Sequence, residues 1–164
     1  MGRSLPTKII FMGSPKFSAV ILEGLIKNGL IPEAVFTQED KIGKRGHKLI
    51  ETEVKKVAKI NSIPIYQPKS LRDEKTVEIL KDISPDFIVV AAYGKILPKE
   101  VLQIPKISCV NVHASILPRW RGASPIHYSI LFGDKKTGVA IMRMDEGIDT
   151  GDIYEVSKEV EIDE

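Results

Sequence analysis

Cysteine is almost absent from this 164-residue sequence, and long apolar runs are missing altogether. The single cysteine, Cys109, excludes a disulfide within the chain and suits a reducing compartment, so we expect a cytoplasmic protein. The longest apolar run, Phe87–Tyr93, is far shorter than the roughly 20 residues of a membrane-spanning helix. The first residues, Met1–Thr7, contain no apolar stretch long enough for a secretory signal.

Patterns for metals and dinucleotides are missing as well. The three histidines do not show the spacing of a zinc site, so we expect no metal: His47, His113 and His127. Gly13-Ser14-Pro15 matches neither a G-x-G-x-x-G turn nor a Walker loop, so we expect no NAD. Cys109 and His113 would lie about 13 Å apart along a strand, which is too far for a thiolate–imidazole pair.

Composition is that of an ordinary globular domain, with 43% hydrophobic and 28% charged residues. A domain of this length buries roughly two-thirds of the surface of its unfolded chain. The net charge is only +2, but its distribution is uneven. Residues 38–59 are rich in Lys and Arg, whereas residues 144–164 are strongly acidic. The basic stretch fits either a surface for a polyanion or a plain solvated surface, and charge alone leaves both open.

Short apolar runs predict strands along the whole chain. They cover Lys8–Met12, Glu33–Thr37, Ile63–Tyr66, Asp86–Ala92, Ile107–His113, Gly138–Met144 and Ile153–Val156. The run Asp86–Ala92 is apolar at successive positions, which is typical of a central strand covered on both faces. Residues 38–48 contain a basic cluster and almost no apolar residue, so we expect an exposed loop there.

Helices are expected between these strands, where apolar residues recur with helical spacing. The recurring sets are Phe17, Val20, Ile21 and Leu25, then Val54, Val57 and Ala58, then Val77, Leu80 and Ile83. Ser70 and Asp73 predict a capping box, and Ser124-Pro125 predicts the N-cap and first turn of a helix ending near Phe132. Alternating strands and helices predict an α/β fold, a Rossmann-like, doubly wound and mostly parallel sheet with helices on both faces.

Two polar side chains at the end of one predicted strand mark the first candidate site. Asn111 and His113 are two residues apart, so they point to the same face about 7 Å from each other. An amide can donate a hydrogen bond to a developing oxyanion, and an imidazole can donate or move a proton. A satisfied buried histidine beside a turn-capping asparagine explains the same pattern, and this short motif alone does not decide.

Two irregular segments strengthen the interpretation as a site. Ser115–Gly122 has neither strand nor helix periodicity, so its apolar residues are suited to line a ligand pocket. Asp145–Asp152 is an acidic loop punctuated by glycines, and a carboxylate from it can orient His113 or accept a proton. The loop also fits a plain turn, although its spacing does not match an EF-hand.

Asn111–Gly122 together with Ile148–Asp152 resembles the folate-dependent formyltransferases, whose shared pattern is Asn-x-His, Ser-Leu-Leu-Pro and a distant Asp-x-Gly loop. Ile116 replaces the first Leu of that pattern. Further segments resemble the family members that formylate methionyl-tRNA: Phe11–Phe17, Val35–Gln38, Lys44–Leu49, Ala92–Pro98 and Met142–Gly151. Gln38-Glu39-Asp40 departs from the Gln-Pro-Asp that is usual in those members.

The resemblance implies a role for each site residue. Asn111 and His113 polarise the formyl carbonyl of 10-formyltetrahydrofolate, and Asp149 orients His113 and assists proton removal from the attacking amine. The implied folate-binding residues are Ser115, Ile116, Leu117, Pro118, Lys95, Ile96, Leu97, Asp145, Glu146 and Gly147. The implied contacts to initiator methionyl-tRNA are Lys44, Arg45, Lys48, Arg119 and Arg121. A solvated rim around a packed Trp120 explains Arg119 and Arg121 equally well.

The resemblance also implies a domain layout. We expect a disordered leader over residues 1–7 and a catalytic domain over residues 8–164, cut short before a tRNA-binding β-barrel, in a monomeric enzyme. One alternative acceptor is a small amine such as an amino-sugar nucleotide, although a long basic loop favours tRNA. Another alternative is a fragment that binds folate or RNA without turnover.

Overall fold

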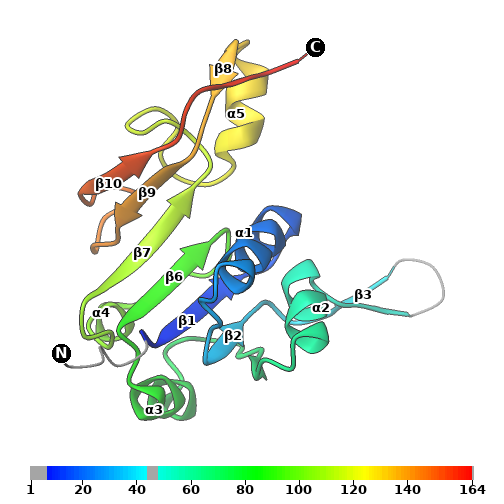
Figure 1. Ribbon diagram of the computed structural model, residues 1–164, viewed down its shortest axis with the longest axis vertical. Helices are drawn as coiled ribbons and strands as arrows, with labels where there is room; N and C mark the ends of the chain where they lie inside the picture. Colours follow the sequence, from blue (N-terminus) through cyan, green and yellow to red (C-terminus); the bar gives the residue numbers. More distant parts are fainter. Residues whose placement is uncertain (1–6, 44–47, 164) are drawn as a thin grey trace. The chain divides into compact units, whose positions relative to one another are not determined.

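The computed structural model describes residues 7–43 and 48–163 and divides the chain into two compact units. Unit 1 is Met1–Ser108 and unit 2 is Cys109–Glu164. The predicted fold class is confirmed: the chain has the Rossmann-like architecture of a mostly parallel sheet with helices, and Figure 1 traces its strands and helices. In the described part of the chain, no helix is long and apolar enough to cross a membrane.

Unit 1 is built on four parallel strands in the order β6-β1-β2-β5. The strands are β1 (Ile9–Gly13), β2 (Ala34–Phe36), β5 (Ile65–Tyr66) and β6 (Phe87–Ala91). The helices are α1 (Lys16–Lys27), α2 (Glu53–Ile60), α3 (Glu74–Ile83) and α4 (Lys99–Leu102). Every residue of β1 and β2 is buried, because both strands are covered on both faces, as their unbroken apolar runs indicate. The short helix α4 was not predicted.

The helical periodicities were correct for α2 and only partly correct for α1. In α2 the buried residues are the predicted Val54, Val57 and Ala58. In α1 the buried residues are Ser18, Ala19 and Leu22, whereas Val20 is 54% exposed. Ser18 fits against the sheet because its hydroxyl donates to the backbone carbonyl of Ala91, so a small polar residue occupies a place where the pattern led us to expect an apolar one.

The N-termini of the helices differ in two ways from the predicted caps. Asp73 is the N-cap of α3, and its carboxylate accepts the backbone N–H of Thr76 at 3.1 Å. Ser70 instead accepts the N–H of Arg72 in a local turn, so the predicted capping box from Ser70 is wrong. In unit 2, Ser124 has the predicted N-cap position, but its side chain makes no capping hydrogen bond.

The segment expected to be an exposed loop, residues 38–48, contains one short strand and directly precedes a second. β3 (Lys41–Ile42) pairs antiparallel with β4 (Leu49–Ile50), and both strands are exposed. Residues 44–47 lie outside the described residues. The prediction of exposure is confirmed for Glu39, Lys41, Ile42 and Lys48, but Gln38, Asp40 and Gly43 are only partly exposed, and the expected absence of regular structure is wrong.

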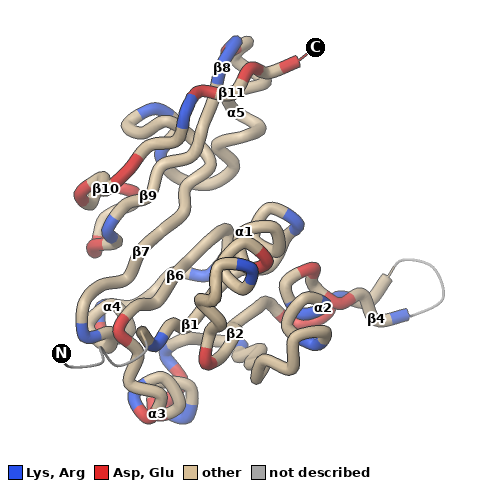
Figure 2. Tube along the Cα trace, viewed as in Figure 1, with Lys and Arg blue, Asp and Glu red and all other residues tan. Residues whose placement is uncertain are grey.

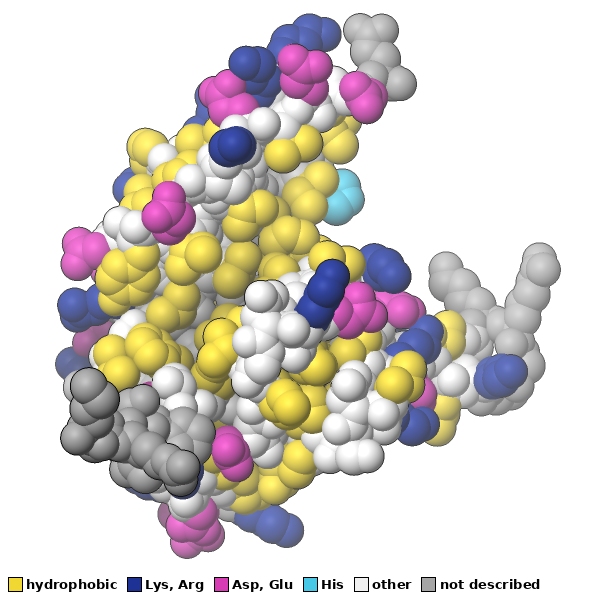
Figure 3. All heavy atoms as spheres, in the orientation of Figure 1, with side chains coloured by type: hydrophobic (Ala, Val, Ile, Leu, Met, Phe, Trp, Pro, Cys, Tyr) yellow, Lys and Arg dark blue, Asp and Glu magenta, His cyan; other side chains and the backbone are white. Residues whose placement is uncertain are grey.

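Unit 2 is built on three antiparallel strands in the order β10-β9-β7. They are β7 (Ser108–His113), β9 (Ala140–Arg143) and β10 (Ile153–Val156), each within a predicted run. Between β7 and β9 lie α5 (Pro125–Leu131) and β8 (Lys136–Thr137), and β8 pairs with β11 (Val160–Glu161). A small core of Leu117, Ala140 and Met142 packs with Val156. Figure 3 shows hydrophobic side chains at the surface, and several belong to α5 and its C-cap, including Leu131 and Phe132.

Candidate active site

The end of β7 places an amide and an imidazole on one face. Asn111 lies opposite Met142 and His113 lies opposite Ala140 in the antiparallel pairing with β9. Side chains two residues apart in a strand point to the same side. His113 is buried, with 6% of its surface exposed, and Asn111 is half-buried. Two polar side chains at this position need partners, because unpaired polar groups are costly to bury.

Asp149 supplies the shared partner. Its Oδ1 accepts a hydrogen bond from Asn111 Nδ2 at 3.2 Å, and its Oδ2 lies 3.6 Å from His113 Nδ1. Oδ2 also accepts the backbone N–H of Gly122 at 2.7 Å. The structure therefore brings Asn111, His113 and Asp149 together around one carboxylate within unit 2. Their catalytic roles stay a prediction.

The backbone of the acidic loop explains how Asp149 reaches this place. Asp149 has φ +52°, in the left-handed region that Asp tolerates better than most residues with a side chain. A Cβ at Gly151 would collide with the carbonyl oxygen of Arg143, so only glycine fits there. Asp145 closes the turn by accepting from Thr150 Oγ1 at 2.7 Å and from the Gly147 N–H at 2.9 Å. These bonds, the Thr150 hydroxyl first, hold the pKa of Asp145 below its usual value.

The predicted folate-binding residues of unit 2 differ in exposure. Ser115 and Leu117 are buried, Ile116 is half-buried and Pro118 is exposed. Ser115 is engaged within its own segment, since its hydroxyl donates to the Arg119 carbonyl at 2.6 Å. The residues of the acidic loop are all exposed: Asp145, Glu146 and Gly147. Their contact with a folate stays a prediction.

Three further predicted folate-binding residues belong to unit 1. The Lys95 ammonium donates to the backbone carbonyls of Pro68 and Lys69. Ile96 is 89% exposed, whereas Leu97 is buried. Exposure of a large apolar side chain suits a residue that contacts a ligand, and burial of Leu97 suits a core role.

The predicted tRNA contacts Arg119 and Arg121 are already engaged in unit 2. Arg119 forms a bidentate pair with Asp134, with Nε–Oδ2 at 2.9 Å and Nη2–Oδ1 at 2.6 Å. Arg121 Nε donates to the backbone carbonyl of Asp149 at 3.0 Å. Hydrogen bonds of this kind fix the orientation of both guanidinium groups. These arginines are therefore better suited to stabilising the structure of the site than to binding the phosphates of a mobile RNA.

Trp120 lies inside a small aromatic cluster rather than on an open rim. Its ring lies 5.0 Å from that of Phe132 and 5.8 Å from that of Tyr128, and the Arg119 guanidinium lies 4.3 Å from its centroid. Its Nε1 donates to Asp134 Oδ2 at 2.6 Å. The Arg119 and Trp120 hydrogen bonds together lower the pKa of Asp134 to about 2. A pocket of about 330 Å³ beside this cluster is lined largely by charged side chains, including Lys136.

Asp134 is a site residue that the sequence analysis missed. It lies 14 residues from Trp120 along the chain, with all of α5 between them. A single acid after the helix-ending Gly133 carries no spacing signal that links it to a tryptophan before the helix. Only the fold brings the two side chains into contact.

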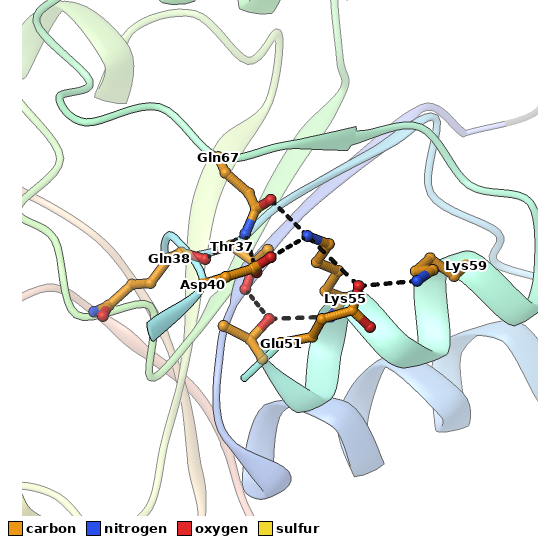
Figure 4. A network of polar contacts seen from close by, with 8 residues as sticks. Thr37, Gln38, Asp40, Glu51, Lys55, Lys59 and Gln67 are labelled. Carbon is orange, nitrogen blue, oxygen red and sulfur yellow. Dashed lines mark hydrogen bonds and ion pairs between the residues drawn. The ribbon is translucent and has the colours of Figure 1, made fainter. Parts of the chain in front are cut away.

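A polar network in unit 1 fixes the start of the basic segment, which is residues 38–48 (Figure 4). The Lys55 ammonium contacts Asp40 Oδ2 at 2.5 Å and Gln67 Oε1 at 3.0 Å, and Gln67 Nε2 donates to Asp40 Oδ1 at 2.8 Å. The Lys55 hydrogen bond holds the pKa of Asp40 below its usual value. Asp40 therefore fixes the backbone just before β3. Glu39, which stands where the resembling family members usually have Pro, is exposed.

Of the predicted tRNA contacts in this segment, one is described. Lys48 is exposed and directly precedes β4. Lys44 and Arg45 lie outside the described residues. Among the residues that the structure describes, no group of three or more His, Cys, Asp or Glu is arranged to hold a metal ion.

Comparison with known proteins identifies the class to which this fold and site belong. The formyl transferase family matches residues 7–164, which is nearly the whole chain. The chain belongs to the formyl transferase family. The chain is 51% identical over 158 residues to a methionyl-tRNA formyltransferase of Clostridium novyi, covering 96% of this chain and 50% of that protein. It is 52% identical over 153 residues to a methionyl-tRNA formyltransferase of Alkaliphilus metalliredigens, covering 93% and 48%. The chain thus spans about half the length of the curated relatives it matches.

Solved structures give the same architecture. A phosphoribosylglycinamide formyltransferase from Bacillus halodurans matches with a TM-score of 0.76 and 25% identity, over 96% of this chain and 81% of that chain. A formyltetrahydrofolate deformylase from Pseudomonas syringae matches with a TM-score of 0.73 and 21% identity, over 97% and 52%. The second likeness shows the fold alone. Proteins that share this architecture therefore carry names that state different substrates.

Proposed function

We propose that this chain carries the catalytic site of an enzyme that transfers a formyl group from 10-formyltetrahydrofolate to the amino group of methionyl-initiator-tRNA. The observation that carries the proposal is the convergence of Asn111 and His113 on the Asp149 carboxylate, at 3.2 and 3.6 Å. The names of the 51% and 52% identical relatives support methionyl-tRNA as the acceptor.

Each of the three groups has a part in amine attack on a formyl carbon. Asn111 has two amide N–H donors, and one of them binds Asp149, so the other is available to the formyl oxygen as negative charge develops there. The imidazole of His113 moves the proton that the attacking amine loses. Asp149 fixes the amide and faces the imidazole, and its own position is fixed by the Gly122 N–H.

The formyl donor supplies an activated carbon, so the chain needs no covalent intermediate. One carbon–nitrogen bond forms to the amine, one breaks to the folate, and the amine proton ends on the folate nitrogen. The chain's part is to position the amine and to stabilise developing charge, which are the terms that dominate such direct transfers. The half-buried Ile116 and exposed Pro118, which follow His113 in the chain, offer apolar surface to the donor.

A chimera tests the proposal, because the relatives are about twice as long as this chain. Residues 1–164 are joined to the remaining part of the Clostridium novyi relative, and formylation of charged initiator tRNA is measured with 10-formyltetrahydrofolate. We expect turnover by the unaltered chimera. His113→Ala and Asp149→Asn should each lower kcat by a factor of about 10² to 10⁴, with the same urea unfolding midpoint as the unaltered chimera. Full turnover by both variants would exclude the site assignment.

The acceptor is tested with the same chimera. An amino-sugar nucleotide offered in place of charged tRNA should remain unformylated. Preferred formylation of the small amine would replace the tRNA in the proposal while leaving the catalytic residues in place. Folate binding without turnover of either acceptor would favour a binding fragment.

A further inference from the structure

Both ring nitrogens of the candidate catalytic histidine face oxygen atoms. His113 Nε2 lies 2.8 Å from the backbone carbonyl oxygen of Trp120, whereas His113 Nδ1 lies 3.6 Å from Asp149 Oδ2. The first distance is that of a good hydrogen bond, and the second exceeds hydrogen-bond length. The two nitrogens are therefore held with very different strength.

The stronger contact fixes the tautomer. A backbone carbonyl can only accept, so Nε2 must carry a proton to bond Trp120. In the neutral ring the other nitrogen, Nδ1, then bears the lone pair. Nδ1 is the nitrogen that faces Asp149, which also binds Asn111, so the unprotonated nitrogen points toward the group of side chains proposed to do the chemistry.

The Trp120 carbonyl is held in place by its own side chain and by its neighbour. Trp120 has φ +59°, a left-handed conformation that a bulky residue keeps only when its surroundings enforce it. Trp120 Nε1 and both ends of the Arg119 guanidinium bind the carboxylate of Asp134. That carboxylate has only 14% of its side chain exposed, and it is the group on which the three hydrogen bonds meet.

We propose that Asp134 is a positioning residue for His113: by holding Trp120 and Arg119, it keeps the Trp120 carbonyl on Nε2 and leaves Nδ1 as the working nitrogen. Asp134 touches neither His113 nor a reacting atom, and it acts through the backbone of Trp120. This inference deepens the proposed function and rests on it only where turnover is concerned. The tautomer itself is a property of the chain alone.

The proton path follows from this arrangement. The lone pair of Nδ1 accepts the proton that the amine loses as its bond to the formyl carbon forms. The proton then lies on the side of the ring that faces the Asp149 carboxylate, and Nδ1 returns it to the folate nitrogen when the second carbon–nitrogen bond breaks. Nε2 keeps its proton on Trp120 throughout.

Nitrogen NMR of the 164-residue chain, labelled with ¹⁵N-histidine, tests the tautomer without any turnover. At a pH where the ring is neutral, we expect a protonated, pyrrole-type signal for Nε2 of His113 and a pyridine-type signal for Nδ1. His113→Gln identifies the signals by their loss. Asp134→Ala should move both signals toward the average of the two tautomers, and Asp134→Asn, which keeps an acceptor for Trp120 Nε1, should largely restore them.

A second variant covers the case in which Asp134→Ala fails to fold. Trp120→Phe keeps an aromatic ring against Phe132 and Tyr128 but removes the Nε1 donor, so it should shift the same two signals. A protonated Nδ1 in the unaltered chain would overturn the inference. Unchanged signals in folded Asp134→Ala, or in Trp120→Phe if Asp134→Ala does not fold, would also overturn it.

Turnover of the chimera gives the second measurement. We expect Asp134→Ala to lower kcat about tenfold or more with little change in KM for charged tRNA, and Asp134→Asn to recover most of the loss. A chimera with no turnover on any acceptor, combined with the expected NMR shifts, would remove the proposed function and leave the positioning role. Normal turnover in Asp134→Ala with unchanged NMR signals would remove the positioning role of Asp134 and leave the proposed function.

Discussion

Cys109 shows how a single side chain is excluded from the chemistry. Its thiol is 2% exposed, and burial raises its pKa to about 12. The thiolate is the reactive form, so each unit of increase lowers its population tenfold at neutral pH. The single cysteine, four residues before His113, is thus packed as a small apolar residue.

We therefore expect slow reaction of native Cys109 with a disulfide reagent such as DTNB at pH 8. The thiolate population alone lowers the rate about a thousandfold relative to the urea-unfolded chain, and burial lowers it further. Cys109→Ser should abolish the signal in both states. Equal rates for native and unfolded chain would show that the thiol is accessible.

A second prediction at the scale of single residues concerns Asp134 and the dependence of stability on acid pH. Its pKa is lowered to about 2 in the folded chain, chiefly by Arg119 and then by Trp120, from an ordinary value of 3.8. The ionised carboxylate therefore stabilises the fold fully above about pH 4. This stabilisation is lost as the pH falls from about 4 through about 2.

Urea unfolding at pH 6, 4 and 2.5 measures this effect. The difference in unfolding free energy between the unaltered chain and Asp134→Asn should be largest at pH 6 and should shrink at pH 2.5. Arg119→Met removes the main cause of the shift, so its difference from the unaltered chain should shrink over the same range. A constant difference across the three pH values would contradict the assignment.

At the scale of elements, the caps of the helices differ in what their side chains contribute. Asp73 accepts the Thr76 N–H at the start of α3, whereas Ser124 at the start of α5 makes no such bond. Asp73→Ala should lower the free energy of unfolding by about 1 kcal/mol, and Ser124→Ala should leave it nearly unchanged. Chemical denaturation of both variants makes the comparison, and equal losses would mean that the cap of α3 contributes nothing specific.

The elements also show what the sequence can and cannot predict. The buried face of α2 and the strands other than β3, β4, β8 and β11 were predictable, because residues such as Val54 and Ala58 follow the period of the element itself. The face of α1 was not, since Ser18 is buried by a hydrogen bond to Ala91 across 73 residues. A polar residue at a buried position carries no hydrophobic signal.

The candidate site likewise contains residues that the sequence could predict and residues that it could not. Asn111 and His113 could be paired from their spacing on one strand. Asp149 lies 38 residues from Asn111, so the pattern suggested only that some carboxylate of the acidic loop acts on His113, and the family resemblance was needed to single out Asp149. The contact of His113 with Trp120 uses a backbone carbonyl, which is the same atom in every residue and therefore leaves no trace in the sequence.

At the scale of the whole molecule, the two units carry opposite charge. Unit 1 contains 18 Lys and Arg against 12 Asp and Glu, so its net charge is +6, whereas unit 2 contains six against ten and has a net charge of −4. Figure 2 shows acidic residues around β10 in unit 2. A polyanion such as tRNA is attracted to the positive unit and repelled by the negative one. Under the proposed function, this separation favours unit 1, with its basic segment, as the part that first meets the tRNA.

The last prediction follows from this separation and uses uncharged initiator tRNA as the probe. Lys41 and Lys48 are exposed, on β3 and just before β4, so the double substitution Lys41→Glu and Lys48→Glu reverses two charges on the basic segment. We expect weaker binding at low salt and a slope of log Kd against log salt that is smaller by about one for each lost phosphate contact. Lys158→Glu, an exposed change in acidic unit 2, reverses one charge and is the control, and it should leave both quantities nearly unchanged. An equal loss per reversed charge in the control would mean that net charge alone, and not the basic segment of unit 1, attracts the RNA.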